Sequence, residues 1–299
     1  MKNKVAVSSL QIYTLLFVIR FGTVMTVGNL FGVQVDIREC ILAPIVLFVA
    51  GFIFILSYKL KNIEFNNIFK TILCIIYFAC IMVYFQRFSG IFDYSLKEQG
   101  DLTPIMIYFS VFCVLSAWLG TKSISRTGII SVVISVLGIL FLMYAMFLKG
   151  DKLNLIPVQY SLQNNMINSS IWLICGTELI ALPELLKLTK ESRKKDFVIF
   201  QFVSLATALL IVILSGNVIG EYGRISPYPI FDAVTASGLG VFKRPDFIYI
   251  TITAVSLFFG AVLFIDLFAD YFTEVFTKNK YRKTVCLVCV LLCFLLTFF

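Results

Sequence analysis

The sequence has 299 residues, of which 60% are hydrophobic and 14% are charged, and its formal net charge is +8. A water-soluble chain this apolar lacks the polar residues needed to cover its surface, which excludes a soluble globular protein. The chain contains no histidine, so Ser-His and Cys-His catalytic arrangements are impossible. It also has no phosphate loop or Gly-rich nucleotide fingerprint. We therefore expect an integral membrane protein that is not an enzyme and carries no cofactor.

Nine apolar runs are each long enough to cross about 30 Å of hydrocarbon as a helix. No Ser-, Gly- or Pro-rich linker divides them, so residues 1–299 are predicted to form a single transmembrane domain. The first run lacks a small-residue cleavage site, and we interpret it as a span and not as a signal peptide. The predicted spans are 9–31, 39–58, 69–88, 102–120, 127–148, 168–187, 197–216, 246–270 and 283–299.

The basic residues between the spans predict the orientation, because cytoplasmic loops are enriched in Lys and Arg. With the N-terminus in the cytoplasm, the inner segments hold twice as many Lys and Arg side chains as the outer ones, among which Arg87 is counted. Membrane insertion explains the positive charge, and no nucleic-acid partner is expected. The eight cysteines lie in or beside apolar runs. They are interpreted as small hydrophobic residues, without a metal site or a disulfide.

The first span contains two pairs of residues unusual for a membrane helix, Gly22 with Gly28 and Thr23 with Thr26. Glycine lets the backbone leave the helix, and irregular backbone at membrane depth is tolerated only where protein buries it or it lines a cavity. The run predicts either a discontinuous helix that binds a polar ligand or close helix packing through small residues. Arg20 in the same span must face the interior or reach a surface, because a charge in the bilayer core is costly.

The sixth span carries Glu178 between Gly176 and Pro183. An intramembrane carboxylate is a functional candidate, and this one can titrate, pair with Arg20 or hold the amine of a ligand. Spans one and six occupy corresponding places in two five-helix halves, the arrangement that points to a transporter-type site near the midplane. The predicted ligand contacts are Gly22, Thr23, Thr26, Gly176, Thr177 and Glu178.

Three further polar features lie near the ends of spans. The outer segment 217–245 is longer than a simple connection. We interpret it as an ordered, gate-like loop with a short helix at 230–241 lying on the membrane surface; a flexible tether is the alternative. Glu184 lies near the cytoplasmic end of span six, and Asp266 and Asp270 near that of span eight. Solvation at the interface is the expected role of all three.

Several short segments follow one another in an order that is typical of one family. They are 9–11 with 20–23, 119–126, 154–157, 228–229 and 242–246. In order and spacing they resemble the B subunits of bacterial spore germinant receptors, a branch of the amino acid–polyamine–organocation transporter superfamily. The resemblance covers most of residues 9–270.

The resemblance implies a five-plus-five inverted-repeat transporter fold with broken helices one and six. It implies a small-molecule germinant, often an amino acid, bound in the spore inner membrane or the bacterial cytoplasmic membrane. The partners would be a receptor A subunit, a lipoprotein C subunit and membrane lipid. The family has ten spans, so a tenth helix is expected to be missing here. Lys243 stands where the family has an acidic residue.

Three functions follow as expectations. The first is a germinant receptor B subunit that binds a small nutrient and triggers germination. The second is an amino acid permease coupled to protons through Glu178. The third is a membrane scaffold for partner subunits that transports nothing.

Overall fold

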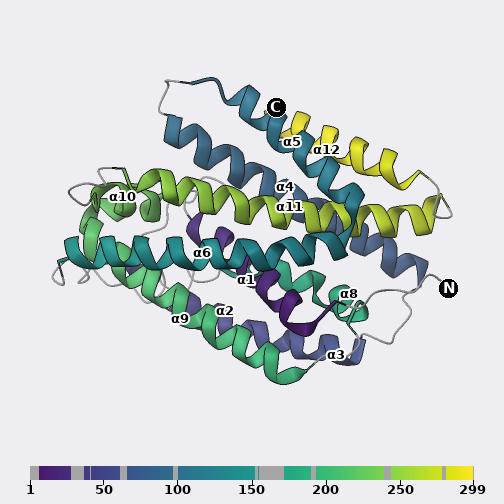
Figure 1. The fold of residues 1–299 in the computed structure, drawn as a ribbon, viewed down its shortest axis with the longest axis horizontal. Coiled ribbons are helices and arrows are strands. Elements are labelled where there is room, and N and C mark those ends of the chain that lie inside the picture. The colour runs from purple at the N-terminus through teal and green to yellow at the C-terminus, as the bar shows by residue number, and fades with distance from the viewer. Residues whose placement is uncertain are drawn as a thin grey trace.

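The computed structural model describes residues 7–27, 37–40, 42–60, 66–96, 100–151, 154, 172–189, 193–238, 244–277 and 281–298. Within these ranges the protein is all α-helical, and its only β-type pairing is an isolated bridge between Val7 and Thr189. Most of the long helices run along the long axis of an elongated bundle (Figure 1).

Five helices in the described ranges are long and apolar enough to cross a membrane. They are α4 (Asn67–Leu96), α5 (Leu102–Leu119), α6 (Thr121–Lys149), α9 (Lys194–Ile219) and α11 (Asp246–Phe276). Their outer faces expose large apolar side chains such as Leu137, which is 64% exposed, and Phe147, which is 69% exposed. Apolar surface of this extent suits contact with lipid, and the prediction of an all-α integral membrane protein is confirmed.

The other four predicted spans correspond to shorter or irregular elements. Helix α1 (Ser9–Met25) and helix α12 (Arg282–Phe298) have 17 residues each. The second span is built from α2 (Ala43–Gly51), the 3-10 helix η2 (Phe52–Leu56) and α3 (Ser57–Leu60). The sixth combines the 3-10 helix η4 (Trp172–Ala181) with α8 (Leu182–Lys187). The count of nine crossings therefore stays a prediction.

The segments predicted to share the inner side meet at one end of the bundle. The amide of Val7 donates to the carbonyl of Leu188 at 3.2 Å, and the Tyr58 hydroxyl donates to the carbonyl of Arg193 at 2.8 Å. In Figure 1, α3 and α8 lie together at this end, and α10 lies at the other. The predicted topology and the side that faces the cytoplasm both stay predictions.

Asp266 is 1% exposed and is not solvated at the interface, so that expectation is wrong. Its carboxylate accepts from the Thr121 amide at 2.6 Å and from the Thr121 hydroxyl, in the first turn of α6. A negative charge there is stabilised by the helix dipole. Arg282 also pairs with Asp266, and its Nε donates to Asp270 at 2.5 Å. This cluster joins α6, α11 and α12.

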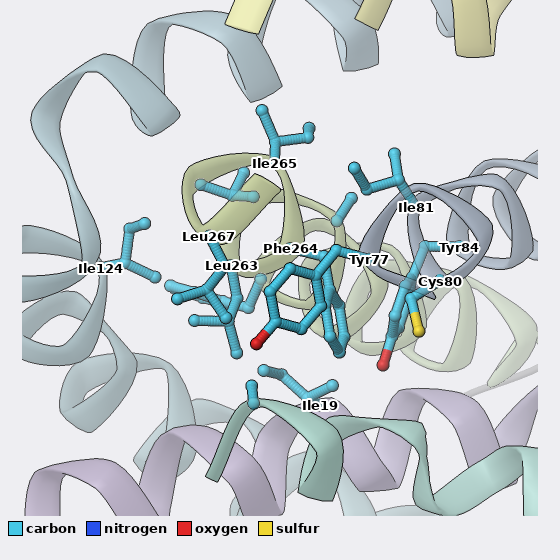
Figure 2. Packing of buried hydrophobic residues seen from close by; sticks show 14 of the residues in the cluster. Ile19, Tyr77, Cys80, Ile81, Tyr84, Ile124, Leu263, Phe264, Ile265 and Leu267 are labelled. Carbon is cyan, nitrogen blue, oxygen red and sulfur yellow. The ribbon is translucent and has the colours of Figure 1, made fainter. Parts of the chain in front are cut away.

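The interior contains two apolar clusters. The larger packs α1 against α4 and α11, where the rings of Tyr77 and Tyr84 lie 5.8 and 5.7 Å from that of Phe264 (Figure 2). The smaller lies around α10 and the neighbouring parts of α1, α6 and α9. A layer of buried polar side chains on four elements lies between the residues of the two clusters. The members of this polar layer are Arg20, Glu178, Gln201, Ser204, Thr253 and Ser256.

The loop that follows α9 is ordered over its described part, through η5 (Gly220–Arg224) and α10 (Pro229–Ala236). Ile230 and Val234 are fully buried, so α10 does not lie on the membrane surface as expected. Its apolar face instead completes the smaller cluster. Asp232 accepts hydrogen bonds from Tyr94 at 2.9 Å and from Ser226 at 2.5 Å. Residues 239–243, which the expected helix and the family-like segment include, lie outside the described residues.

Gly260 provides a test of the packing of α4 against α11. A Cβ at this position would overlap the ring of Tyr84, which is fully buried and stacked on Phe264. Because overpacking a filled core costs about 1–3 kcal/mol, Gly260→Ala should lower the thermal unfolding temperature of the purified protein. Gly138→Ala is the matched control, since its Cβ would meet the mobile tip of Ile252. Equal unfolding temperatures for the two variants would contradict this packing.

Candidate functional site

Helix α1 leads into the middle of the bundle and ends there. Ser8 begins it with a capping box, accepting from the amide of Gln11 at 3.2 Å and donating its own amide to the Gln11 side chain at 2.9 Å. Most of its residues are buried on all sides, which is typical of a helix enclosed by others. The helix ends at Met25 with Thr26 as its C-cap. The helix therefore ends before the predicted span 9–31 does, and whether that span is interrupted stays a prediction, because Gly28 lies outside the described residues.

The first half of the sixth span is irregular over its described length. Element η4 is a 3-10 helix of ten residues, whereas such helices rarely exceed three or four residues because their hydrogen bonds are poorly aligned. It continues into α8, with Pro183 in the first turn, a position that tolerates proline because its amide has no partner there. Of the two spans predicted to be interrupted, the sixth is thus irregular in its described part, whereas the first is a regular α-helix that ends at Met25.

Arg20 and Glu178 form a buried ion pair between these two elements. The Arg20 Nε lies 2.5 Å from Glu178 Oε1, and the side chains are 4% and 0% exposed. Of the three roles considered for Glu178, pairing with Arg20 is the one that the structure shows. Because each charge neutralises the other, both can lie in an apolar interior.

The ion pair extends to α9. Arg20 Nη1 donates to Gln201 Oε1 at 2.8 Å, and its guanidinium lies 4.7 Å from the centre of the Phe200 ring. Gly51 of α2 leaves the space for Gln201, because a Cβ there would come within 2.6 Å of the amide nitrogen. Within the part of the chain that the structure describes, three polar atoms have no hydrogen-bond partner: Arg20 Nη2, Glu178 Oε2 and Gln201 Nε2. The polar layer thus retains unused donors and acceptors.

A small cavity of about 10 Å³ adjoins Arg20 between α1 and α9. It is lined by Phe17, Arg20 and Ser204, among others. The Ser204 hydroxyl is buried without a partner, as is Arg20 Nη2. A volume of this size accommodates one water molecule, and the two unpaired groups suit it.

The end of α1 contacts η4 directly through polar groups. The Thr23 hydroxyl lies 2.8 Å from the carbonyl of Arg20 and 2.9 Å from that of Cys175. The Thr26 hydroxyl donates to the carbonyl of Gly22 at 2.9 Å. The two predicted threonines therefore lie at the junction of the interrupted elements, where they bond to backbone carbonyls.

Arg87 of α4 lies against the same junction. It is 3% exposed, and its Nη1 donates to the carbonyl of Thr23 and, at 3.1 Å, to the hydroxyl of Thr26. The Cys175 sulfur lies 3.8 Å from Nη2. A cation at the C-terminus of a helix is stabilised by the helix dipole and satisfies free carbonyls. Arg87 thus fixes the point at which α1 ends.

The remaining predicted contacts surround this junction. Gly22 faces Ser256 of α11 so closely that a Cβ would overlap that side chain, which is the close helix packing weighed as the alternative. Gly176 faces Leu47, since a Cβ added to Gly176 would lie 2.8 Å from Cδ1 of Leu47. The Thr177 hydroxyl lies 3.3 Å from that of Tyr84. The structure brings the six predicted residues into one region, and ligand contact stays a prediction.

Sequence reasoning missed two members of the site. Arg87 was assigned to an outer loop because the third span was predicted to end at residue 88, whereas α4 continues to Leu96. Gln201 lies in an apolar run between Phe200 and Phe202. A lone amide in that setting was a signal that could have identified it. Glu184, expected to be solvated, pairs with Lys187 at 2.7 Å and accepts from Tyr271.

No protein-family model matches the sequence, and no curated protein matches it. The function must therefore be inferred from the site itself. The site combines an ion pair, a second buried arginine, the C-terminal end of a buried helix and one irregular segment, which together suit the binding of a small polar molecule.

The ion pair predicts strong coupling between Arg20 and Glu178. Glu178→Gln should destabilise the protein by about 3–5 kcal/mol, because it leaves the arginine buried without its counter-charge. Arg20→Met combined with Glu178→Leu should recover most of that loss, since no charge then remains buried. Thermal or denaturant unfolding in detergent measures both of these variants together with the single variants Arg20→Met and Glu178→Leu. Additive losses in the double variant would contradict a direct pair.

Proposed function

We propose that this protein is a membrane-embedded sensor of the germinant receptor B-subunit type. It binds a small polar molecule, such as an amino acid, at the junction of α1 and η4. The single observation that supports this most is that the end of α1 meets the 3-10 segment η4 inside a buried polar layer, with the Thr23 hydroxyl 2.9 Å from the Cys175 carbonyl. Transporter-type sites are built from such segments. The sequence resemblance supplies the biological setting.

The state of Glu178 favours a sensor over a proton-coupled permease. A coupling carboxylate has to take up and release a proton during each cycle, which requires access to water and release from its counter-charge. Glu178 is fully buried, and one of its oxygens is held by Arg20 at 2.5 Å. A sensor needs only that ligand binding favours one arrangement of the site over another.

The proposal includes an architecture and a setting. Nine crossing helices, with α1 and η4 at corresponding places of an inverted repeat, give a site at mid-depth. The N-terminus lies in the cytoplasm, and the protein resides in the spore inner membrane or the bacterial cytoplasmic membrane. A receptor A subunit and a lipoprotein C subunit are its partners, and ligand binding triggers germination.

Gly176→Leu tests the site. The nearest atom to a Cβ at residue 176 is the flexible tip of Leu47, so the leucine should fold in place while it blocks the junction. We expect spores that carry this variant to lose their germination response, with normal protein level in the membrane. Gly128→Ala, in α6 beside Leu15, is the control and should respond normally. An unchanged dose response in Gly176→Leu would refute the site.

A transport measurement distinguishes the sensor function from the permease function. Purified protein in proteoliposomes should not accumulate labelled amino acids when a proton gradient is imposed. Uptake that depends on the gradient and on Glu178 would instead support the permease. Normal germination in spores that lack the protein would refute the receptor role.

A further inference from the structure

The buried charges at the junction do not balance. Arg20 and Glu178 cancel each other, whereas Arg87 is 3% exposed and has no carboxylate within ion-pair distance in the described part of the chain. One net positive charge is therefore buried beside the end of α1. An isolated cation in an apolar interior is costly, so a structure that retains one requires a reason.

The groups around Arg87 compensate this charge only in part. Its partners are a carbonyl, a hydroxyl and a thiol, on Thr23, Thr26 and Cys175. The C-terminus of a helix supplies an effective negative charge of about one half. The Nε of Arg87 is buried and has no acceptor among the described residues. The guanidinium therefore lacks an anionic group that would accept a hydrogen bond from Nε and balance the remaining positive charge.

We propose that Arg87 binds the carboxylate of the ligand, and that the ligand is therefore a small carboxylate anion or a zwitterion. A guanidinium matches a carboxylate with parallel, charge-assisted hydrogen bonds. An amine or a neutral sugar brings no negative charge to Arg87. This inference rests on the proposed ligand site at the α1–η4 junction, and it adds the chemical class of the ligand and the group that anchors it.

The test compares acids with their amides, which differ in charge but hardly in size. The thermal unfolding of the purified protein in nanodiscs is measured with acetate, propionate, glycine and L-alanine, and with the four corresponding amides, at constant ionic strength. A ligand that binds only the folded protein raises its unfolding temperature. We expect at least one acid to raise it while its amide does not. A comparison of the simple acids with the amino acids then shows whether the ligand is an anion or a zwitterion.

Two variants assign the effect to Arg87. Arg87→Gln should weaken the acid's binding at least about tenfold, because it removes a charge-assisted hydrogen bond. Arg282→Gln is the matched control, since Arg282 lies in the cluster with Asp266 and Asp270, and should retain the response. If Arg87→Gln does not fold, the comparison of acids with amides in the wild-type protein still decides.

The measurement distinguishes a failure of the Arg87 inference from a failure of the proposed ligand site. Equal stabilisation by acids and amides would overturn the role of Arg87 and leave the proposed site intact. Stabilisation only by neutral probes, such as glucose, would have the same meaning. If no probe shifts the unfolding temperature, both this inference and the small-molecule site are overturned.

Discussion

The ion pair between Arg20 and Glu178 is the interaction on which the arrangement of the bundle centre depends. A charge at this depth is tolerated only with a partner in place. Arg20 therefore fixes the rotation of α1 relative to η4, and through Gln201 it also fixes α9. A buried pair of this kind contributes little net stability compared with apolar residues of similar volume. Its effect here is to set the orientation of α1 relative to η4, because any other rotation of α1 would separate the charges.

Two glycines, Gly22 and Gly51, leave the space that this arrangement of helices needs. Gly22 brings α1 onto Ser256 of α11, and Gly51 admits Gln201 beside α2. In a membrane, small residues at helix contacts allow close approach, and polar side chains then hydrogen-bond across the contact. The two readings of Gly22 weighed from the sequence are therefore compatible. Gly22 thus packs α1 against α11 close to the point at which α1 ends.

Much of the fold could be predicted from the sequence because long apolar runs are strong signals. The five long helices coincide with predicted spans, and the irregular η4 lies where glycine and polar residues inside an apolar run predicted a break. The burial of Arg87 and Asp266 could not be predicted in this way. Hydropathy gives the approximate extent of a helix but not its exact end. It also does not show which distant residue lies beside a charge near that end.

The two arginines of the site differ in a way that bears on sensing. Arg20 has a permanent counter-charge in Glu178, so its environment changes little when a ligand arrives. Arg87 is bound by the carbonyl of Thr23 and the hydroxyl of Thr26, both at the end of α1. The proposed anionic ligand would neutralise Arg87 through its free Nε and so weaken the contact that fixes where α1 ends. A ligand shifts a conformational equilibrium only through such differential interactions, and the α1–η4 junction is the element on which this one would act.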